Sequence, residues 1–268
     1  RIDEPLSLTD LHRAIDARLP QLDLPELILE MHARTGFAAA FTHASEGNAR
    51  AEDIATTICA VLVAEATNTG FEPLVRPEVS ALRRSRLSWV KQNFIRAETL
   101  TTANALLVAA HNRIPLARVW GSGEVASADG LRFTVPVRTI HAGPNPRYFG
   151  RERGITWYNL VSDRFSGLNA LTVPGTLRDS LYLLAVVLDQ ETELRPGEIM
   201  TDTAGYTDTI FGIFHLLGLQ FSPRIADIGG ARFWRVDGKA DYGVLDDLAA
   251  NRINTRHFQN SLQIRSFC

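Results

Sequence analysis

Two aspartates stand where a sheet protein could bind metal ions. Asp202 follows the apolar run "EIMT" and precedes a Gly-containing turn and a long apolar segment in "PGEIMTDTAGYTDTIFGIFHLLG" (196–218). A carboxylate just beyond the C-terminal end of a strand is where α/β folds usually place ligand chemistry. Asp129 lies in a second strand-like run, "VASADGLRF". Each aspartate has an ordinary alternative, helix capping for Asp202 and an Asp-Gly hairpin turn for Asp129.

The chemistry of such a pair is metal-assisted phosphoryl transfer. Two carboxylates can hold two Mg2+ ions about 4 Å apart, one activating the attacking oxygen and the other stabilising the leaving oxygen. Mg2+ takes hard oxygen ligands from few side chains and keeps sites for phosphate and water. We therefore expect Asp129 and Asp202 to lie on neighbouring strands, with their carboxylates less than roughly 10 Å apart, the limit for a shared metal pair.

The elements from residue 121 onward are those that must position the two aspartates. Short runs rich in Val, Ile, Thr and aromatic residues predict three antiparallel strands, in "VASADGLRFTVPV", "GITWYNLVSD" and "LNALTVPG". A helix, the strand "EIMTD", a second helix and a fifth strand, "ARFWRV", follow. This order is typical of the ribonuclease-H-like fold, a mixed sheet with helices on its faces, whose first and fourth strands are neighbours.

The sequence of residues 1–120 predicts helices. Apolar residues recur at helical spacing, and "LPELILEMHARTG" begins after Asp23 with Pro in its first turn. We expect an all-α helical scaffold domain over 1–120 and a ribonuclease-H-like catalytic domain over 121–268. The link "RIPLARVWGSGEV" is short and apolar, so the helices should pack against the sheet, with Trp120 buried at the junction.

Composition narrows the class of protein. The chain has 268 residues, 45% of them hydrophobic, and a net charge of -2, which neither favours nor excludes a nucleic-acid partner. Its two cysteines form no zinc spacing or disulfide framework, which favours a reducing compartment, the cytoplasm by default. No apolar run is long enough to span a bilayer, so we expect no membrane role.

Several longer strings make the assignment more specific. "SADGLRF", "NPRYFGRERGITWYNLVSD", "VPGTLRDSLYLL", "TDTAGYTD" and "FGIFHLLGLQFSPRIADI" resemble the catalytic region of replicative transposases of the Tn-three family. The earlier "ELILEMHARTGF", "FTHASEGNAR" and "NALLVAAHNRIPLARVWGSGEVASADG" are similar to the helical segment that precedes it there. The resemblance extends to about residue 256.

The resemblance implies a DNA transposase that uses Mg2+ or Mn2+ to cleave transposon ends and join them to target DNA, in the bacterial cytosol and as a homodimer when full-length. It places the first two catalytic aspartates on Asp129 and Asp202, so that capping falls to Thr207 or Asp208. The family's catalytic glutamate has no counterpart, because no Glu occurs after Glu198. We therefore expect an incomplete domain with little activity alone. The spacing of Asp246 and Asp247 nominates them as replacements, but paired aspartates near a helix start are commonly capping residues, and we reject them.

Further residues are candidates for DNA contact. Arginines near the motifs could bind phosphates, with surface charge as the alternative: Arg132, Arg147, Arg151, Arg178 and Arg224. Tyr148, Trp157 and Tyr158 could stack on unpaired bases, although strand aromatics are more often core. The basic run "RRSRLSWVKQNFIR" (83–96) is more typical of a solvated helix face.

Two rival functions remain to be weighed. "DTAG" matches the D-x-x-G of nucleotide switches, but the chain has no phosphate-binding G-x-x-x-x-G-K-[ST] loop, which excludes a GTPase. The alternative that stays open is an inactive scaffold or DNA-binding fragment of a transposase.

Overall fold

The computed structural model describes residues 5–45, 52–176, 182–202, 207–225, 234–235, 237–247, 249 and 251–252. The chain divides into two compact units, Arg1–Pro223 and Arg224–Cys268, which are described separately. Within the described residues, no helix combines the length and the apolar composition that crossing a bilayer requires.

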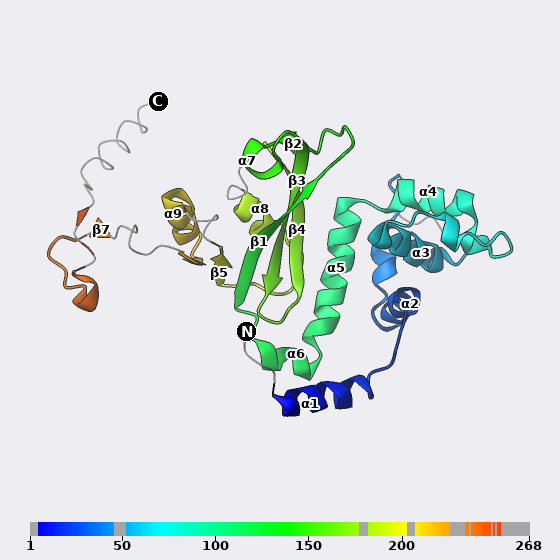
Figure 1. Cartoon of the computed structure of the whole chain (residues 1–268), viewed down its shortest axis with the longest axis horizontal. Coiled ribbons are helices and arrows are strands. Elements are labelled where there is room, and N and C mark those ends of the chain that lie inside the picture. The colour runs from blue at the N-terminus through cyan, green and yellow to red at the C-terminus, as the bar shows by residue number, and fades with distance from the viewer. Residues whose placement is uncertain are drawn as a thin grey trace. The chain divides into compact units, whose positions relative to one another are not determined.

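Up to Trp120, the secondary structure of the described residues in the first unit is helical (Figure 1). They are α1 (Leu6–Asp16), α2 (Leu24–Thr35), η1 (Phe37–Ala40), α3 (Ile54–Thr67), η2 (Glu72–Leu74), η3 (Ser80–Leu82), α4 (Arg84–Phe94), α5 (Ala97–Asn112) and α6 (Pro115–Trp120). Local signals set their ends: the Asp23 carboxylate accepts a hydrogen bond from the Glu26 N–H, and Gly36 ends α2 with φ 68°. A buried apolar core lies among α2–α5 and includes Phe37, Ile58 and Leu87.

A mixed sheet follows in the same unit. Its elements are β1 (Val125–Thr134), β2 (Gly143–Pro144), α7 (Pro146–Phe149), β3 (Arg153–Ser162), β4 (Gly167–Pro174), α8 (Leu183–Leu188), β5 (Glu198–Thr201), α9 (Asp208–Leu216) and β6 (Gln220–Pro223). β3 pairs antiparallel with β1 and β4, while β5 lies parallel to β1 and β6. The pairing of β1, β3, β4 and β5 is that expected from the sequence, with β2 as a short addition to β3.

One face of the sheet carries its apolar core. Ala126 and Ala128 of β1, Leu160 of β3 and Ile199 of β5 are buried there against Leu183, Val186, Ile210 and Phe214 of α8 and α9. Strand residues of the opposite parity are more exposed, among them Ser127, Asp129 and Trp157. The alternation therefore assigns Asp129 to the face opposite the core.

Helix α5 joins the helical segment to the sheet. The Asn104 side chain donates to the Gly167 carbonyl at 2.8 Å, and His111 Nδ1 and Ser166 Oγ are 2.6 Å apart. In Figure 1 α5 runs beside β4, in agreement with these contacts. Helix α5 thus packs against the sheet, as the short apolar link predicts for the helical segment.

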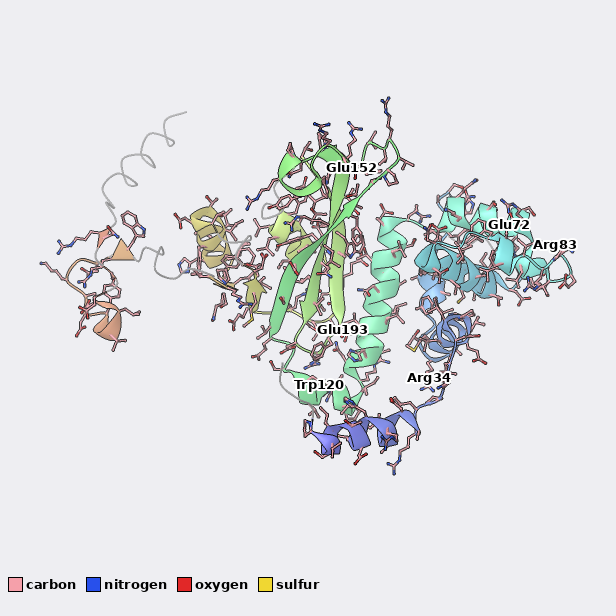
Figure 2. The ribbon with its side chains drawn as sticks, viewed as in Figure 1. Arg34, Glu72, Arg83, Trp120, Glu152 and Glu193 are labelled. Carbon is pink, nitrogen blue, oxygen red and sulfur yellow. The ribbon has the colours of Figure 1, made fainter. Side chains whose placement is uncertain are left out.

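Two expectations about particular residues are wrong. The strand that closes the sheet is β6, whereas the described part of "ARFWRV" forms β7 (Trp234–Arg235), which pairs with β8 (Asn251–Arg252) in the second unit. Trp120, labelled in Figure 2, is 65% exposed at the end of α6. Its ring makes an edge contact with Phe165. The junction is closed by polar groups instead: the Asp163 carboxylate accepts from the Gly123 N–H, and Arg164 donates to the Gly121 carbonyl.

The second unit contains β7, β8 and the 3-10 turn η7 (Gly243–Leu245) among its described residues. Arg235 organises this part of the chain. Its guanidinium donates to the Ala249 carbonyl and to the Asp246 carboxylate, the latter at 2.5 Å. Asp246 is therefore a structural ion-pair partner here.

Candidate functional site: two aspartates and a basic hairpin

The two candidate carboxylates lie at one edge of the sheet. β1 and β5 pair in parallel register from Val125↔Glu198 to Ala128↔Thr201, and Asp129 and Asp202 are the next residues along the chain. β5 ends at Thr201, while β1 continues to Thr134 with β3 alone as its neighbour. The backbone thus brings Asp129 and Asp202 to adjacent positions at the C-terminal end of the parallel pair.

Asp129 lies within β1 on the face opposite the core, and Asp202 is the first residue after β5. Ala128 and Thr201, one residue earlier, are paired and buried, while Asp129 and Asp202 are exposed. The Asp129 Oδ1 accepts a hydrogen bond from the Gly130 N–H at 2.7 Å. The cap of α9 falls to Thr207, whose hydroxyl accepts from the Ile210 N–H at 3.2 Å. Thr207 is therefore the N-cap residue of α9.

The donor set fits a hard divalent cation in part. Two aspartates supply oxygen ligands of the kind that Mg2+ and Mn2+ prefer. Among the described residues, however, no cluster of three or more His, Cys, Asp or Glu side chains could hold a metal ion. The described residues thus supply two carboxylates and no third acidic ligand.

A stretch rich in arginine, residues 130–154, follows Asp129 in the chain, and we call it the basic hairpin. Arg132, on the extension of β1 beyond Asp129, places its guanidinium 3.9 Å from the centre of the Tyr148 ring, and Arg147 lies 5.4 Å from the same ring. Arg151 is exposed in the turn before β3, and the structure adds two exposed arginines that sequence reasoning missed, Arg138 and Arg153. The residues from 130 to 154 contain five arginines and one acidic residue, Glu152, which is labelled in Figure 2. The high density of arginine in this stretch is the sequence signal that could have identified Arg138 and Arg153.

Local packing fixes the Tyr148 ring in this hairpin. The Asn145 side chain caps α7 by accepting from the Arg147 N–H, and it donates to the Gly175 carbonyl at 2.7 Å. Phe149 is buried against Gly154 and Gly175, where an added Cβ would come within 2.3 and 2.8 Å of its ring atoms. Glycine at both positions lets α7 dock on the sheet, and α7 in turn holds Tyr148 close to Arg132 and Arg147.

The other predicted arginines are less informative. Arg178 lies outside the described residues. Arg224 is exposed directly after β6 and belongs to the second unit, so it is not grouped with the hairpin.

The basic run 83–96 has intramolecular partners. Lys91 pairs with Glu65 at 2.7 Å, Arg84 with Glu72, and Arg96 donates to the Thr42 carbonyl. Arg86 donates to the Thr57 hydroxyl and to the Glu52 carbonyl. Arg84 and Lys91 are exposed in these ion pairs, which is consistent with a solvated helix face.

Sequence reasoning also missed Asn159, which pairs with Asp129 in the β1–β3 register. No sequence signal distinguishes this asparagine, because its importance depends on the register alone.

Comparisons with known proteins identify related sequences. Residues 26–264 match the family described as "Tn3 transposase DDE domain", so the match includes most of the tail after residue 256. Over 247 residues the chain is 59% identical to the transposase for transposon gamma-delta of Escherichia coli (strain K12), covering 92% of this chain and 25% of that protein. It is 46% identical over 265 residues to the transposase for transposon Tn4556 of Streptomyces fradiae. This match covers 97% of this chain and 30% of that protein.

A more distant relative is the transposase for transposon Tn1546 of Enterococcus faecium, 33% identical over 254 residues and covering 95% of this chain and 26% of that protein. The chain thus spans between a quarter and a third of the length of these curated relatives.

Proposed function

Because the chain belongs to the Tn3 transposase DDE domain family, we propose that it forms the catalytic region of a DNA transposase that cleaves transposon ends and joins them to target DNA. The observation that supports this proposal is the parallel register of β1 and β5, which ends at Ala128↔Thr201, one residue before Asp129 and Asp202. Carboxylates at that position suit metal-assisted phosphoryl transfer.

In this proposal Asp129 and Asp202 hold divalent cations, Mg2+ or Mn2+. A metal pair bound there would activate the attacking oxygen and stabilise the leaving oxygen of a phosphodiester. The two side chains contribute negative charge and hard oxygen ligands, and the hydrogen bond from Gly130 orients Asp129. Their exposure leaves room for a DNA strand to approach.

The architecture in this proposal is a ribonuclease-H-like catalytic domain over 121–268 after an all-α scaffold domain over 1–120. Two separate apolar cores support it, one within the helices and one between the sheet, α8 and α9. The hydrogen bonds from α5 to β4 hold the scaffold against the sheet and thereby support the strands that carry the aspartates.

The basic hairpin provides the DNA contact. Arg132, Arg147 and Arg151 lie beyond Asp129 along β1 and around α7, so a strand bound at the aspartates can continue along them. Arginine contacts to phosphate give affinity that is independent of sequence and falls with salt. Arg178 and Arg224 stay proposed contacts of the same kind.

The described residues offer no third acidic ligand beside Asp129 and Asp202, so we expect the chain alone to have weak metal affinity and no strand transfer. The full-length protein is proposed to act as a homodimer on DNA in the bacterial cytosol. The alternative is a scaffold or DNA-binding fragment in which the two aspartates are inert.

A version extended through the family's glutamate helix separates these functions. We expect it to nick transposon-end DNA with Mg2+ or Mn2+, and Asp129→Ala or Asp202→Ala to abolish nicking while DNA binding persists. Asp208→Ala, which removes a neighbouring carboxylate, is the matched control and should keep activity. Undiminished nicking by the Asp129 or Asp202 variant would refute the metal site, and no nicking by the extended protein would favour the scaffold alternative.

A further inference from the structure

A pocket of about 380 Å3 lies between α5 and the sheet face that carries Asp129. Its walls include Leu100, Thr101 and Asn104 from α5, and Trp157, Asn159 and Val161 from β3. The volume lies within the range of roughly 300–1,000 Å3 that is usual for small-ligand sites. Hydrogen bonds from the Asn104 amide to the Gly167 and Leu168 carbonyls hold α5 in place as one wall.

The pocket is next to the candidate metal site. Asn159 is the cross-strand partner of Asp129, and Trp157 is the partner of Leu131 on the same face. Directly paired residues of antiparallel strands have their Cβ atoms about 5 Å apart. A nucleotide whose phosphate lies at Asp129 therefore has the pocket within reach of its own base or of the next base along the strand.

The chemistry of the walls selects a flat, neutral ligand with a polar edge. Trp157 is 41% exposed and offers an aromatic face, while Leu100 and Val161 supply apolar contacts. The Asn159 amide, with donors and an acceptor, makes no side-chain hydrogen bond within the described part of the chain. None of the described residues that line the pocket is charged, so it does not favour a phosphate group.

We propose that this pocket binds a nucleobase turned out of the DNA strand beside the reacting phosphate, with Trp157 stacking on the base and Asn159 bonding to its edge. The proposal rests on the proposed function, because it takes the reacting phosphate to lie at Asp129. It adds a base-binding site to a surface where the arginines are proposed to contact phosphates. Turning a base out costs stacking energy, which stacking on an aromatic side chain offsets.

The test measures binding of the 268-residue chain, in EDTA, to a fluorescent single-stranded oligonucleotide and to an abasic one of the same length. Phosphate contacts are common to both, so the ratio of the two affinities reports base binding alone. We expect the chain to prefer the oligonucleotide with bases by roughly tenfold, the usual contribution of one stacked base. Trp157→Leu should abolish the preference and Trp157→Phe should retain most of it.

Trp120→Leu is the matched control, because Trp120 is also an exposed tryptophan but lies at the end of α6. It should leave the preference unchanged. Asn159→Leu, similar in size but without the amide, should reduce discrimination among oligonucleotides that differ in base. Far-UV circular dichroism and urea unfolding of each variant exclude a folding defect.

Four outcomes overturn the inference. Equal affinity of the unaltered chain for both oligonucleotides would refute the pocket and leave the proposed metal site intact, since the assay contains no metal. A preference that survives Trp157→Leu, or that Trp120→Leu removes, would place base binding elsewhere. Failure of the chain to bind either oligonucleotide at low salt would refute the DNA contact of the proposed function as well.

Discussion

Replacing Gly154 with alanine should undock α7 and disturb the basic hairpin. An alanine Cβ at this position would lie 2.3 Å from Phe149 Cε1 and 2.4 Å from Cζ, closer than such atoms can approach. The side chain of Phe149 is 9% exposed, so the ring must leave an almost fully buried site. Losing the burial of a phenylalanine costs about 1.5–3 kcal/mol, and alanine returns about 0.5–1 kcal/mol relative to glycine in a strand.

We therefore expect Gly154→Ala to lower the free energy of unfolding by about 1–2 kcal/mol, measured by urea titration with tryptophan fluorescence and circular dichroism. Gly167→Ala is the matched control, because Gly167 is also a strand glycine but has no neighbouring atom within 4 Å of the place an alanine Cβ would take. It should be neutral or stabilise slightly. Phosphate affinity should fall in Gly154→Ala, since Tyr148 moves with α7.

A double-mutant cycle tests the reasoning itself. Phe149→Ala alone should cost about 3–5 kcal/mol, because it empties a buried site. In the Gly154→Ala, Phe149→Ala protein the new methyl group occupies space that the ring has left, so the combined loss should fall short of the sum by more than about 0.5 kcal/mol. Additive losses, or an undiminished stability of Gly154→Ala, would refute the proposed packing.

Three further changes have definite expected results. Gly212→Ala in α9 should raise stability by about 0.5–1 kcal/mol in urea unfolding, because its site is open and alanine favours helix. Thr201→Val should raise it by up to about 1 kcal/mol, since the buried Thr201 hydroxyl has no hydrogen-bond partner among the described residues; a loss would show that the hydroxyl is satisfied. Burial raises the pKa of the Cys59 thiol to about 11, so in a Cys268→Ser protein a thiol reagent at pH ~8 should label Cys59 only after urea is added.

Local patterns were sufficient to predict the strands that carry the aspartates. "VASADGLRFT" and "EIMT" are bounded by glycine and proline and rich in strand-forming residues, and they form β1 and β5. The element order then predicts that these strands are neighbours. The register, Ala128 beside Thr201, follows from packing of the buried alternate residues and could not be derived from either segment alone.

The closing strand shows where local patterns fail. β6 has four residues, includes Pro223 and follows the helix after Gly218 and Leu219, so its sequence resembles a turn. "ARFWRV" has a stronger strand pattern, yet its described residues pair in the second unit. Pairing partners outweigh intrinsic preference for such short segments. The expectation for Trp120 failed for a similar reason, because hydrogen bonds of Asp163 and Arg164 rather than an apolar side chain close the junction.

The register of β1 restricts how the length of this chain can change. Side chains alternate along a strand, so deleting one residue between Val125 and Asp129 would turn the aspartate toward Ile199 and the core. The same holds for β5 before Asp202. We expect insertions and deletions to be tolerated instead in the segment between Thr134 and Gly143, which joins β1 to β2 and lies outside the strands. Variation in length among natural or engineered versions should therefore collect there, and the spacing within each of the two strands should stay fixed.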